Sequence, residues 1–189
     1  FLSALEDSGS VGKGSGWQPL PLLAEAADGQ LIGAMPAYGK SHSQGEYVFD
    51  QAWADAWQRA GGRYYPKLQI AVPFTPATGR RLLLRDNAAP AIAPALIAAA
   101  EQLVVQQKLG SAHATFIAPQ EVALFEAAGW LIREDSQFHF ENDGYSDFDD
   151  FLARLSSAKR KTLRKERQRA RQGLEIVHLT GDAIRPEHW

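Results

Sequence analysis

The sequence contains no cysteine, only one methionine and no long apolar run. The lack of cysteine excludes a disulfide framework, a thiolate zinc site, an iron–sulfur cluster and a cysteine nucleophile. No stretch approaches the roughly 18 to 20 consecutive apolar residues that would cross a bilayer, and the first residues form no cationic leader before an apolar run. Secretion has no support in these features, so we expect a cytoplasmic protein.

The composition is otherwise that of an ordinary globular domain. Of the 189 residues, 45% are hydrophobic and 22% are charged. The hydrophobic content is enough to bury one core, and the chain is too short to form two large domains. Because the sequence starts with Phe1 and ends in Pro186 to Trp189, which resembles a first helical turn, we expect a fragment of a longer protein.

Charge is segregated along the chain although the net charge is only −2. Residues 154–171 carry nine basic side chains and one acid, a net +8, so the remainder carries −10. An acidic patch precedes this run, which suits the helix macrodipole and predicts one basic helix over residues 151–172. The helix either contacts an anion, such as nucleic acid phosphate or a lipid surface, or is a solvated connector. Its candidate anion-binding residues are Lys159, Arg160, Lys161, Arg164 and Lys165.

A glycine-rich stretch around Lys13 suggests a phosphate-binding loop only superficially. A Walker loop needs glycine five residues before its Gly-Lys pair and a hydroxyl residue after it, but Asp7 and Gly14 occupy those places here. We therefore expect a flexible loop over residues 9–16.

Periodicity predicts a mixed α/β (α+β) fold, with a mostly antiparallel sheet flanked by helices. An Asp28-Gly29 turn joins the first two expected strands into a hairpin. The expected strands cover residues 20–25, 31–38, 68–72, 112–117, 130–132, 137–140 and 174–179. The expected helices before the basic one cover residues 50–60, 91–109 and 119–129.

Two features in residues 72–140 resemble the core of the GCN5-related N-acyltransferase (GNAT) fold. The stretch Val122 to Trp130, read as Val-Ala-Leu-Phe-Glu-Ala-Ala-Gly-Trp, is similar to that family's closing Ala-x-x-Leu-Tyr-Glu-x-x-Gly-Phe pattern. The Thr75 to Arg80 turn stands where the family binds the pyrophosphate of acyl-coenzyme A, although it has only one glycine.

A more specific resemblance is to the FemAB-like branch, associated with peptidoglycan biosynthesis or recognition. It is carried by three blocks: Lys40 to Asp50, Tyr64 to Pro76 and Leu155 to Glu166. The resemblance implies a first GNAT-like half over residues 1–150, a basic connector helix over 151–172 and the start of a second GNAT-like half over 173–189.

The resemblance also implies transfer of an aminoacyl or acyl group to an amine, with acyl-CoA or aminoacyl-tRNA as donor. Such a reaction needs a base for the amine and a donor for the tetrahedral oxyanion. Candidate catalytic residues are Glu46, His42 and Tyr47. Candidate substrate-binding residues are Tyr64, Tyr65 and Lys67. Candidate cofactor-binding residues are Thr75, Thr78, Gly79 and Arg80, because a turn that enters a helical region is a natural anion site.

Each of these residues also has a structural explanation. The adjacent tyrosines could pack at a strand entrance, a loop glutamate could be solvated, and two prolines could fix the turn. The five histidines lack metal-ligand spacing, and the sequence has no Gly-x-Ser-x-Gly elbow. Two hypotheses stay open. The first is an N-acyltransferase that is incomplete in this fragment. The second is a non-catalytic module that recognises tRNA, a lipid surface or a cell-wall precursor through the basic helix.

Overall fold

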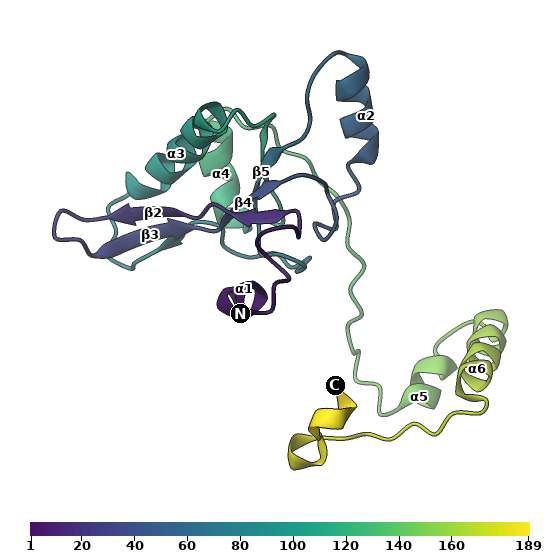
Figure 1. Ribbon diagram of the computed structural model, residues 1–189. Helices are drawn as coiled ribbons and strands as arrows, with labels where there is room; N and C mark the ends of the chain where they lie inside the picture. The colour runs from purple at the N-terminus through teal and green to yellow at the C-terminus, as the bar shows by residue number, and fades with distance from the viewer. The chain divides into compact units, whose positions relative to one another are not determined.

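A computed structural model describes all 189 residues, which divide into two compact units, Phe1–Glu134 and Asp135–Trp189. Figure 1 shows the elements of both units. The first unit contains the helices α1 Leu2–Asp7, α2 Gln51–Arg59, α3 Ile92–Gln106 and α4 Pro119–Ala127. Its strands are β1 Trp17–Pro19, β2 Leu22–Glu25, β3 Leu31–Met35, β4 Ala37–Lys40, β5 Lys67–Ile70, β6 Leu83–Leu84 and β7 Ala112–Ala114.

The first unit is a mixed α+β fold, as the sequence predicts. Strands β1, β4, β5 and β7 form one sheet in that order, and β2, β3 and β6 form a second. All neighbouring strands are antiparallel except the parallel pair β5 and β7. The expected hairpin is confirmed as β2 and β3. The expected strand over residues 31–38 is instead two strands, β3 and β4, which belong to different sheets on either side of Pro36.

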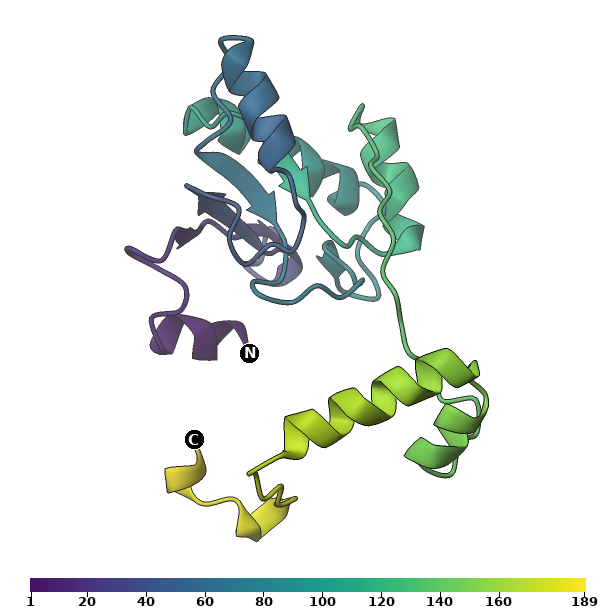
Figure 2. The ribbon, with the colours of Figure 1, turned by 90° about the vertical axis from the view of Figure 1, so that its right-hand side faces the viewer.

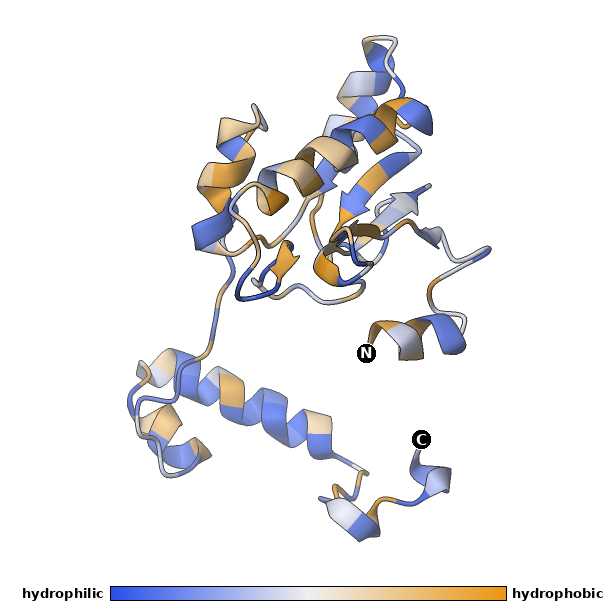
Figure 3. Cartoon of the chain, turned by 90° about the vertical axis from the view of Figure 1, so that its left-hand side faces the viewer, coloured by the Kyte–Doolittle hydropathy of each residue, from blue (hydrophilic) through white to orange (hydrophobic).

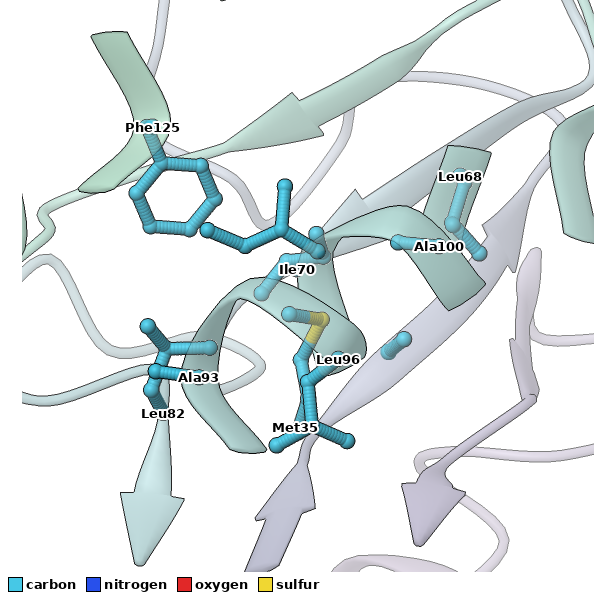
Figure 4. Close-up of a cluster of buried hydrophobic side chains, with 10 residues drawn as sticks. Met35, Leu68, Ile70, Leu82, Ala93, Leu96, Ala100 and Phe125 are labelled. Atoms are coloured by element: carbon cyan, nitrogen blue, oxygen red, sulfur yellow. The ribbon is translucent and has the colours of Figure 1, made fainter. Parts of the chain in front are cut away.

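The hydrophobic core lies between the sheets and helices α3 and α4 (Figure 4). Leu96 and Ile97 of α3 are 3% and 0% exposed and pack with Leu68 and Ile70 of β5, both 0% exposed. Phe125 from α4 completes this cluster and stacks edge-on against Trp130. Burial of this apolar surface is the main favourable contribution to folding of the unit.

The residues that resemble the acyltransferase closing motif form α4 and its end. Pro119 occupies the first helical turn, where its missing N–H has no partner to lose. Glu121, also in the first turn, is buried and accepts hydrogen bonds from the backbone amides of Arg81 and Leu82 at 2.9–3.1 Å. Gly129, with φ of +84°, follows the helix and confirms the expected stop.

The second unit contains α5 Phe148–Ala153 and α6 Ser157–Arg171, followed by the short 3₁₀ helices η1 Gly181–Ala183 and η2 Pro186–His188. The expected single helix over residues 151–172 is therefore wrong in detail, and Figure 2 shows two helices joined by a turn. The break falls at Ser156, whose backbone is extended with ψ of 152°. Asp147 caps α5 by accepting a hydrogen bond from the amide of Asp150 at 2.8 Å.

Three of the predicted strands do not form. Residues 130–132, 137–140 and 174–179 have no regular secondary structure, and most of their side chains are exposed. The alternation of polar and apolar residues predicts half-buried strands, but no neighbouring strand offers hydrogen bonds at these positions. A lone extended segment cannot satisfy its backbone groups as a sheet does, so the pattern alone was not sufficient.

Candidate functional site

Strand β5 divides the first unit into an apolar side and a polar side. Its residues alternate across the sheet, so that Leu68 and Ile70 enter the core while Lys67 and Gln69 face the other way. All four are fully buried. A strand buried on both faces normally carries apolar residues on both. The polar face of β5 is therefore a candidate functional site.

Two buried lysines lie opposite each other on this polar face. The antiparallel register of β4 and β5 pairs Lys40 with Lys67, and both side chains are 0–1% exposed. Like charges directly opposite in a sheet destabilise it unless other groups compensate. The compensation comes from the loop that follows β4, the Lys40 to Asp50 block of the family resemblance.

Lys67 is the centre of the resulting charge network. Its Nζ donates to Glu46 Oε2 at 2.8 Å, to Asp50 Oδ2 at 2.7 Å and to Ser43 Oγ at 3.0 Å. Tyr64 donates to the same Asp50 oxygen at 2.7 Å. The Tyr65 hydroxyl shares a 2.6 Å hydrogen bond with Ser43 Oγ, which extends the chain of polar groups outward to a half-buried side chain.

Lys40 closes the other end of the network. Its Nζ lies 3.9 Å from Glu46 Oε1, donates to the Gln44 carbonyl at 2.9 Å and sits 3.5 Å from the centre of the Trp17 ring. The Trp17 indole N–H donates to the same Gln44 carbonyl at 3.2 Å. A cation over a buried indole gains electrostatic stabilisation that partly offsets the loss of water.

The pKa values in the network move in different directions. Burial raises the pKa of the Glu46 carboxyl, and the attraction of Lys67 does not overcome it. Burial also acts to raise the pKa of Asp50, but hydrogen bonds from Lys67 and Tyr64 outweigh it, so the pKa is lowered. Burial lowers the pKa of Lys40 to about 8, against the opposing charge of Glu46. Buried ionisable groups with such shifts are typical of functional sites, although structural networks show them too.

Two buried carboxylate oxygens have no hydrogen-bond partner, Glu46 Oε1 and Asp50 Oδ1. Buried polar atoms are paired in the large majority of cases, so each exception calls for an explanation. Both oxygens belong to the loop that the network holds in place. The carboxyl groups therefore retain free acceptor positions for a proton or for a donor group.

The loop itself has a conformation that depends on glycine. Gly45 has φ of +80°, and a Cβ at this position would lie 2.6 Å from the Phe74 ring. Its carbonyl accepts a hydrogen bond from the Phe74 amide at 3.2 Å. Glycine at this place lets the backbone turn while Glu46 points inward.

The structure places the other predicted catalytic residues outside the network. His42 packs against Gly16 and accepts a hydrogen bond from the Gln44 amide through Nδ1 at 3.2 Å. Tyr47 is 53% exposed and has φ of 59°. It lines a cavity of about 180 Å³ on the outer side of the loop. Thus Glu46 comes together with Tyr64, Tyr65 and Lys67, whereas His42 and Tyr47 do not.

The Thr75 to Arg80 turn lies apart from any helix start. Strand β6 separates it from α3, which begins at Ile92, so the expectation that the turn enters a helix is wrong. The amide of Gly79 donates to the Phe116 carbonyl, the Thr75 hydroxyl donates to the Pro73 carbonyl, and Thr78 and Arg80 are exposed. The cofactor-binding role of these four residues stays a prediction.

The neighbouring Arg81 explains how this turn is held. Arg81 is 2% exposed, and its guanidinium donates to the carbonyls of Ala77, Arg80 and Thr115 at 2.9–3.2 Å. Its charge is thus surrounded by backbone acceptors instead of facing solvent. The shape of the turn therefore depends on Arg81, which is not among the predicted site residues.

Three members of the network, Lys40, Ser43 and Asp50, were not predicted as individual site residues. Each stands in the block that resembles the FemAB-like family. Of these three residues, Lys40 alone has a usable signal in the sequence, since it follows a predicted strand just as Lys67 precedes one. The register that pairs the two strands is what brings them together.

In the second unit the predicted anion-binding residues lie along α6, most of which is hydrophilic (Figure 3). Lys159, Lys161, Arg164 and Lys165 are exposed, and Arg160 is half-buried and donates to the Ala153 carbonyl. A cavity of about 340 Å³ lies between α5 and α6. Its cationic side chains are Arg164, Arg167 and Arg171, of which only Arg164 was expected.

No helix of the structure combines the length and apolar character needed to cross a membrane. No curated protein and no solved structure matches the chain. A family model does match, over residues 1–189, and it describes FemAB-like proteins of peptidoglycan biosynthesis or recognition. The match covers both the buried charge network and the basic helix, and the chain therefore belongs to this FemAB-like family, whose members take part in peptidoglycan biosynthesis or recognition.

Proposed function

We propose that this chain takes part in N-acyl transfer to an amine of a peptidoglycan precursor. The observation that carries the proposal is the buried network that connects Glu46 to the half-buried Tyr65. Four buried ionisable groups are costly to place in a fold, and replacing such a set by apolar residues is often stabilising. Their presence is better explained by chemistry or by positioning than by stability.

The network offers a path for the proton that amide formation must remove. The attacking amine would give its proton to the Tyr65 oxygen while the Tyr65 hydroxyl proton moves to Ser43. Because the Lys67 ammonium donates to both Ser43 and Glu46 and has no lone pair, it must give one of its own protons to Glu46 as it takes the Ser43 proton, so these two transfers occur together. The new C–N bond replaces the bond between the acyl carbon and the sulfur or oxygen of the donor, and the leaving thiolate or tRNA ribose oxygen takes up the proton that Glu46 has received, which restores the Glu46 carboxylate. The raised pKa of Glu46 makes its carboxylate a better proton acceptor than an ordinary glutamate.

A transfer assay tests this proposal. The chain is incubated with a peptidoglycan precursor that carries a free amine, together with acetyl-coenzyme A or aminoacyl-tRNA, and the product is identified by mass spectrometry. We expect a new amide, and Tyr65→Phe should lower kcat by roughly 10² to 10⁴-fold because the proton path is cut. Lys13→Met, an exposed lysine of the same unit, serves as the control and should leave the rate unchanged.

Absence of the amide with both donors would contradict the transferase proposal. A thermal shift separates the two donors, since a ligand that binds only the native state raises the unfolding midpoint. Stabilisation by coenzyme A that is lost in Arg80→Ala would support the Thr75 to Arg80 turn as the donor site. Stabilisation by aminoacyl-tRNA alone would favour the other donor. The second GNAT-like half and the cytoplasmic location stay predictions.

A second candidate function is recognition of an anionic partner by the second unit, such as tRNA, a lipid surface or a cell-wall precursor. The cavity that contains Arg164, Arg167 and Arg171 favours it, because Asp149 is its only acidic residue. For RNA binding, the logarithm of the association constant should fall linearly with the logarithm of the salt concentration. We expect Arg167→Ala to reduce that slope by about one if the side chain contacts a phosphate. An unchanged slope would count against a phosphate contact by this side chain.

A further inference from the structure

In the loop between β4 and α2, the charged side chains are buried and the aromatic side chains Tyr47 and Phe49 are exposed. The two charged residues between Ser41 and Gln51, Glu46 and Asp50, turn inward and are 3% and 4% exposed. The aromatic residues Tyr47 and Phe49 turn outward and are 53% and 78% exposed. The loop therefore presents to solvent a surface without formal charge, although the buried network lies directly beneath it.

The outward side of this loop is hollowed. The cavity of about 180 Å³ is lined by Ser43 to Gly45, Tyr47 to Phe49 and Gln51. Its lining combines two aromatic rings with the carboxamides of Gln44 and Gln51, both exposed. A carboxamide offers both a donor and an acceptor, which matches a neutral group that both gives and receives hydrogen bonds.

Helix α2, which follows this loop in the chain, carries two further exposed aromatic side chains. Trp53 and Trp57 are one helical turn apart, and they are 64% and 54% exposed. The Trp57 indole lies against Gly62, so one side of the ring is supported by backbone. Ala54 is the only buried residue of the helix. Large exposed aromatic side chains on one face of a helix are typical of a binding surface.

We propose that the cavity between Ser43 and Gln51 binds a sugar ring of the peptidoglycan precursor, and that Trp53, two residues beyond Gln51 in the chain, extends this site. A pyranose presents an apolar face of C–H groups that can lie on an aromatic ring, and its edge carries hydroxyl groups that both donate and accept hydrogen bonds. An uncharged lining with aromatic rings and carboxamides fits that chemistry, whereas a phosphate or carboxylate ligand would call for a cation. The small volume suits one ring rather than a larger ligand.

The inference rests on the proposed function, because that function supplies an acceptor that contains sugar. It also gives the buried network a second purpose. By drawing Glu46 and Asp50 inward, Lys67 leaves the outer side of the loop neutral and fixes the positions of Tyr47 and Phe49. The sugar would thus lie on the outer side of the loop, where Ser43 belongs both to the cavity lining and to the proton path.

Titration of the chain with N-acetylglucosamine and with soluble oligomers of it tests the proposal, with tryptophan fluorescence and NMR shifts as readouts. We expect saturable binding with shifts confined to residues 43–57, and affinity at least about tenfold lower in Trp53→Ala and in Tyr47→Ala. Trp189→Ala, 93% exposed in the other unit, is the matched control and should bind like the unsubstituted chain. Non-saturable binding, or affinity unchanged in both cavity variants, would overturn the proposal.

The failure of this inference can be told apart from failure of the proposed function. Amide formation on a sugar-containing precursor that is unaffected by Trp53→Ala would remove the sugar site and leave the transferase. Saturable sugar binding without amide formation would keep the sugar site and remove the transferase. Concentration-dependent dimerisation that is abolished by Trp53→Ala would assign the aromatic surface to a second copy of the chain and overturn the proposal.

Discussion

Replacement of Lys67 by methionine is the sharpest test of the buried network. Lys67→Met keeps the length and apolar stem of the side chain but removes the charge that two carboxylates share. Glu46 and Asp50 are then left buried without their common partner. An uncompensated buried charge is strongly destabilising, which is the physical reason to expect a large effect.

The expected loss is about 3 to 5 kcal/mol of unfolding free energy, the range for breaking a buried ion pair by removing one partner. This is a large part of the roughly 5 to 15 kcal/mol that a domain has in total. With a urea m-value of about 2 kcal/mol/M, the midpoint should fall by about 1.5 to 2.5 M. The slope should stay the same, because the surface exposed on unfolding does not change.

The assay is urea unfolding followed by tryptophan fluorescence. Trp17, which is 1% exposed and lies under Lys40, reports on the neighbourhood of the network. Lys13→Met is the control and should shift the midpoint very little, since Lys13 is exposed. A double-mutant cycle with Asp50→Asn should give a coupling free energy of roughly 0.5 to 3 kcal/mol, as expected for residues in one network.

An unfolding free energy of Lys67→Met within about 1 kcal/mol of the unsubstituted chain would refute the reasoning, since it lies below the range for a broken buried pair. It would mean that the carboxylates are hydrated or protonated once the lysine is gone. A change in slope instead would indicate that the folded state itself has loosened. In that case the loop between β4 and α2 would depend on Lys67 for its structure as well as its stability.

Three further predictions concern the same unit. Glu121→Gln should lower the unfolding free energy by about 1 to 3 kcal/mol, because two backbone amides lose a charged acceptor. Urea unfolding measures this loss. An unchanged unfolding free energy would show that the amides find other acceptors. Burial lowers the pKa of Lys40 to about 8 from 10.5, so the unfolded state binds more protons between those values and stability should rise with pH there. Lys40→Met should abolish this rise in unfolding curves measured from pH 8 to 10, and an equally steep rise in the variant would assign it to another group. Burial, with a smaller contribution from Lys67, lowers the pKa of His113 to about 4. Its ring resonances in NMR should therefore keep their neutral-state positions down to pH 5. A titration midpoint of these resonances near 6.5 would contradict the burial of this side chain.

Much of the fold follows from local sequence patterns. The Asp28-Gly29 turn permits the backbone of a tight hairpin, and β2 and β3 form beside it. The apolar spacing that predicts a helix over residues 91–109 is confirmed by α3, in which Leu96 is buried, and Gly129 follows the end of α4 as expected. These features depend on residues close together in the sequence, so periodicity and turn chemistry were sufficient to predict them.

The expectations that failed depend on partners that are distant in the sequence. Leu174 to Leu179 alternates like a strand but has no neighbour to pair with, and Pro36 divides one expected strand between two sheets. The basic helix breaks at Ser156, where serine has weak helix propensity and the extended backbone ends one helix and begins the next, α6. Local pattern indicates what a segment can form, and tertiary neighbours decide whether it does.

The sequence by itself determined the fold class, the basic helix region and the candidate residues Glu46, Tyr64, Tyr65 and Lys67. Only the tertiary structure decided that these four residues meet, and that Lys40 and Asp50 join them while His42 and Tyr47 do not. The physical reason is register: pairing of β4 with β5 sets Lys40 opposite Lys67, and the two carboxylates of the intervening loop must turn inward to neutralise them. Charge balance in a buried space, which no local pattern encodes, thus fixes the shape of the candidate site.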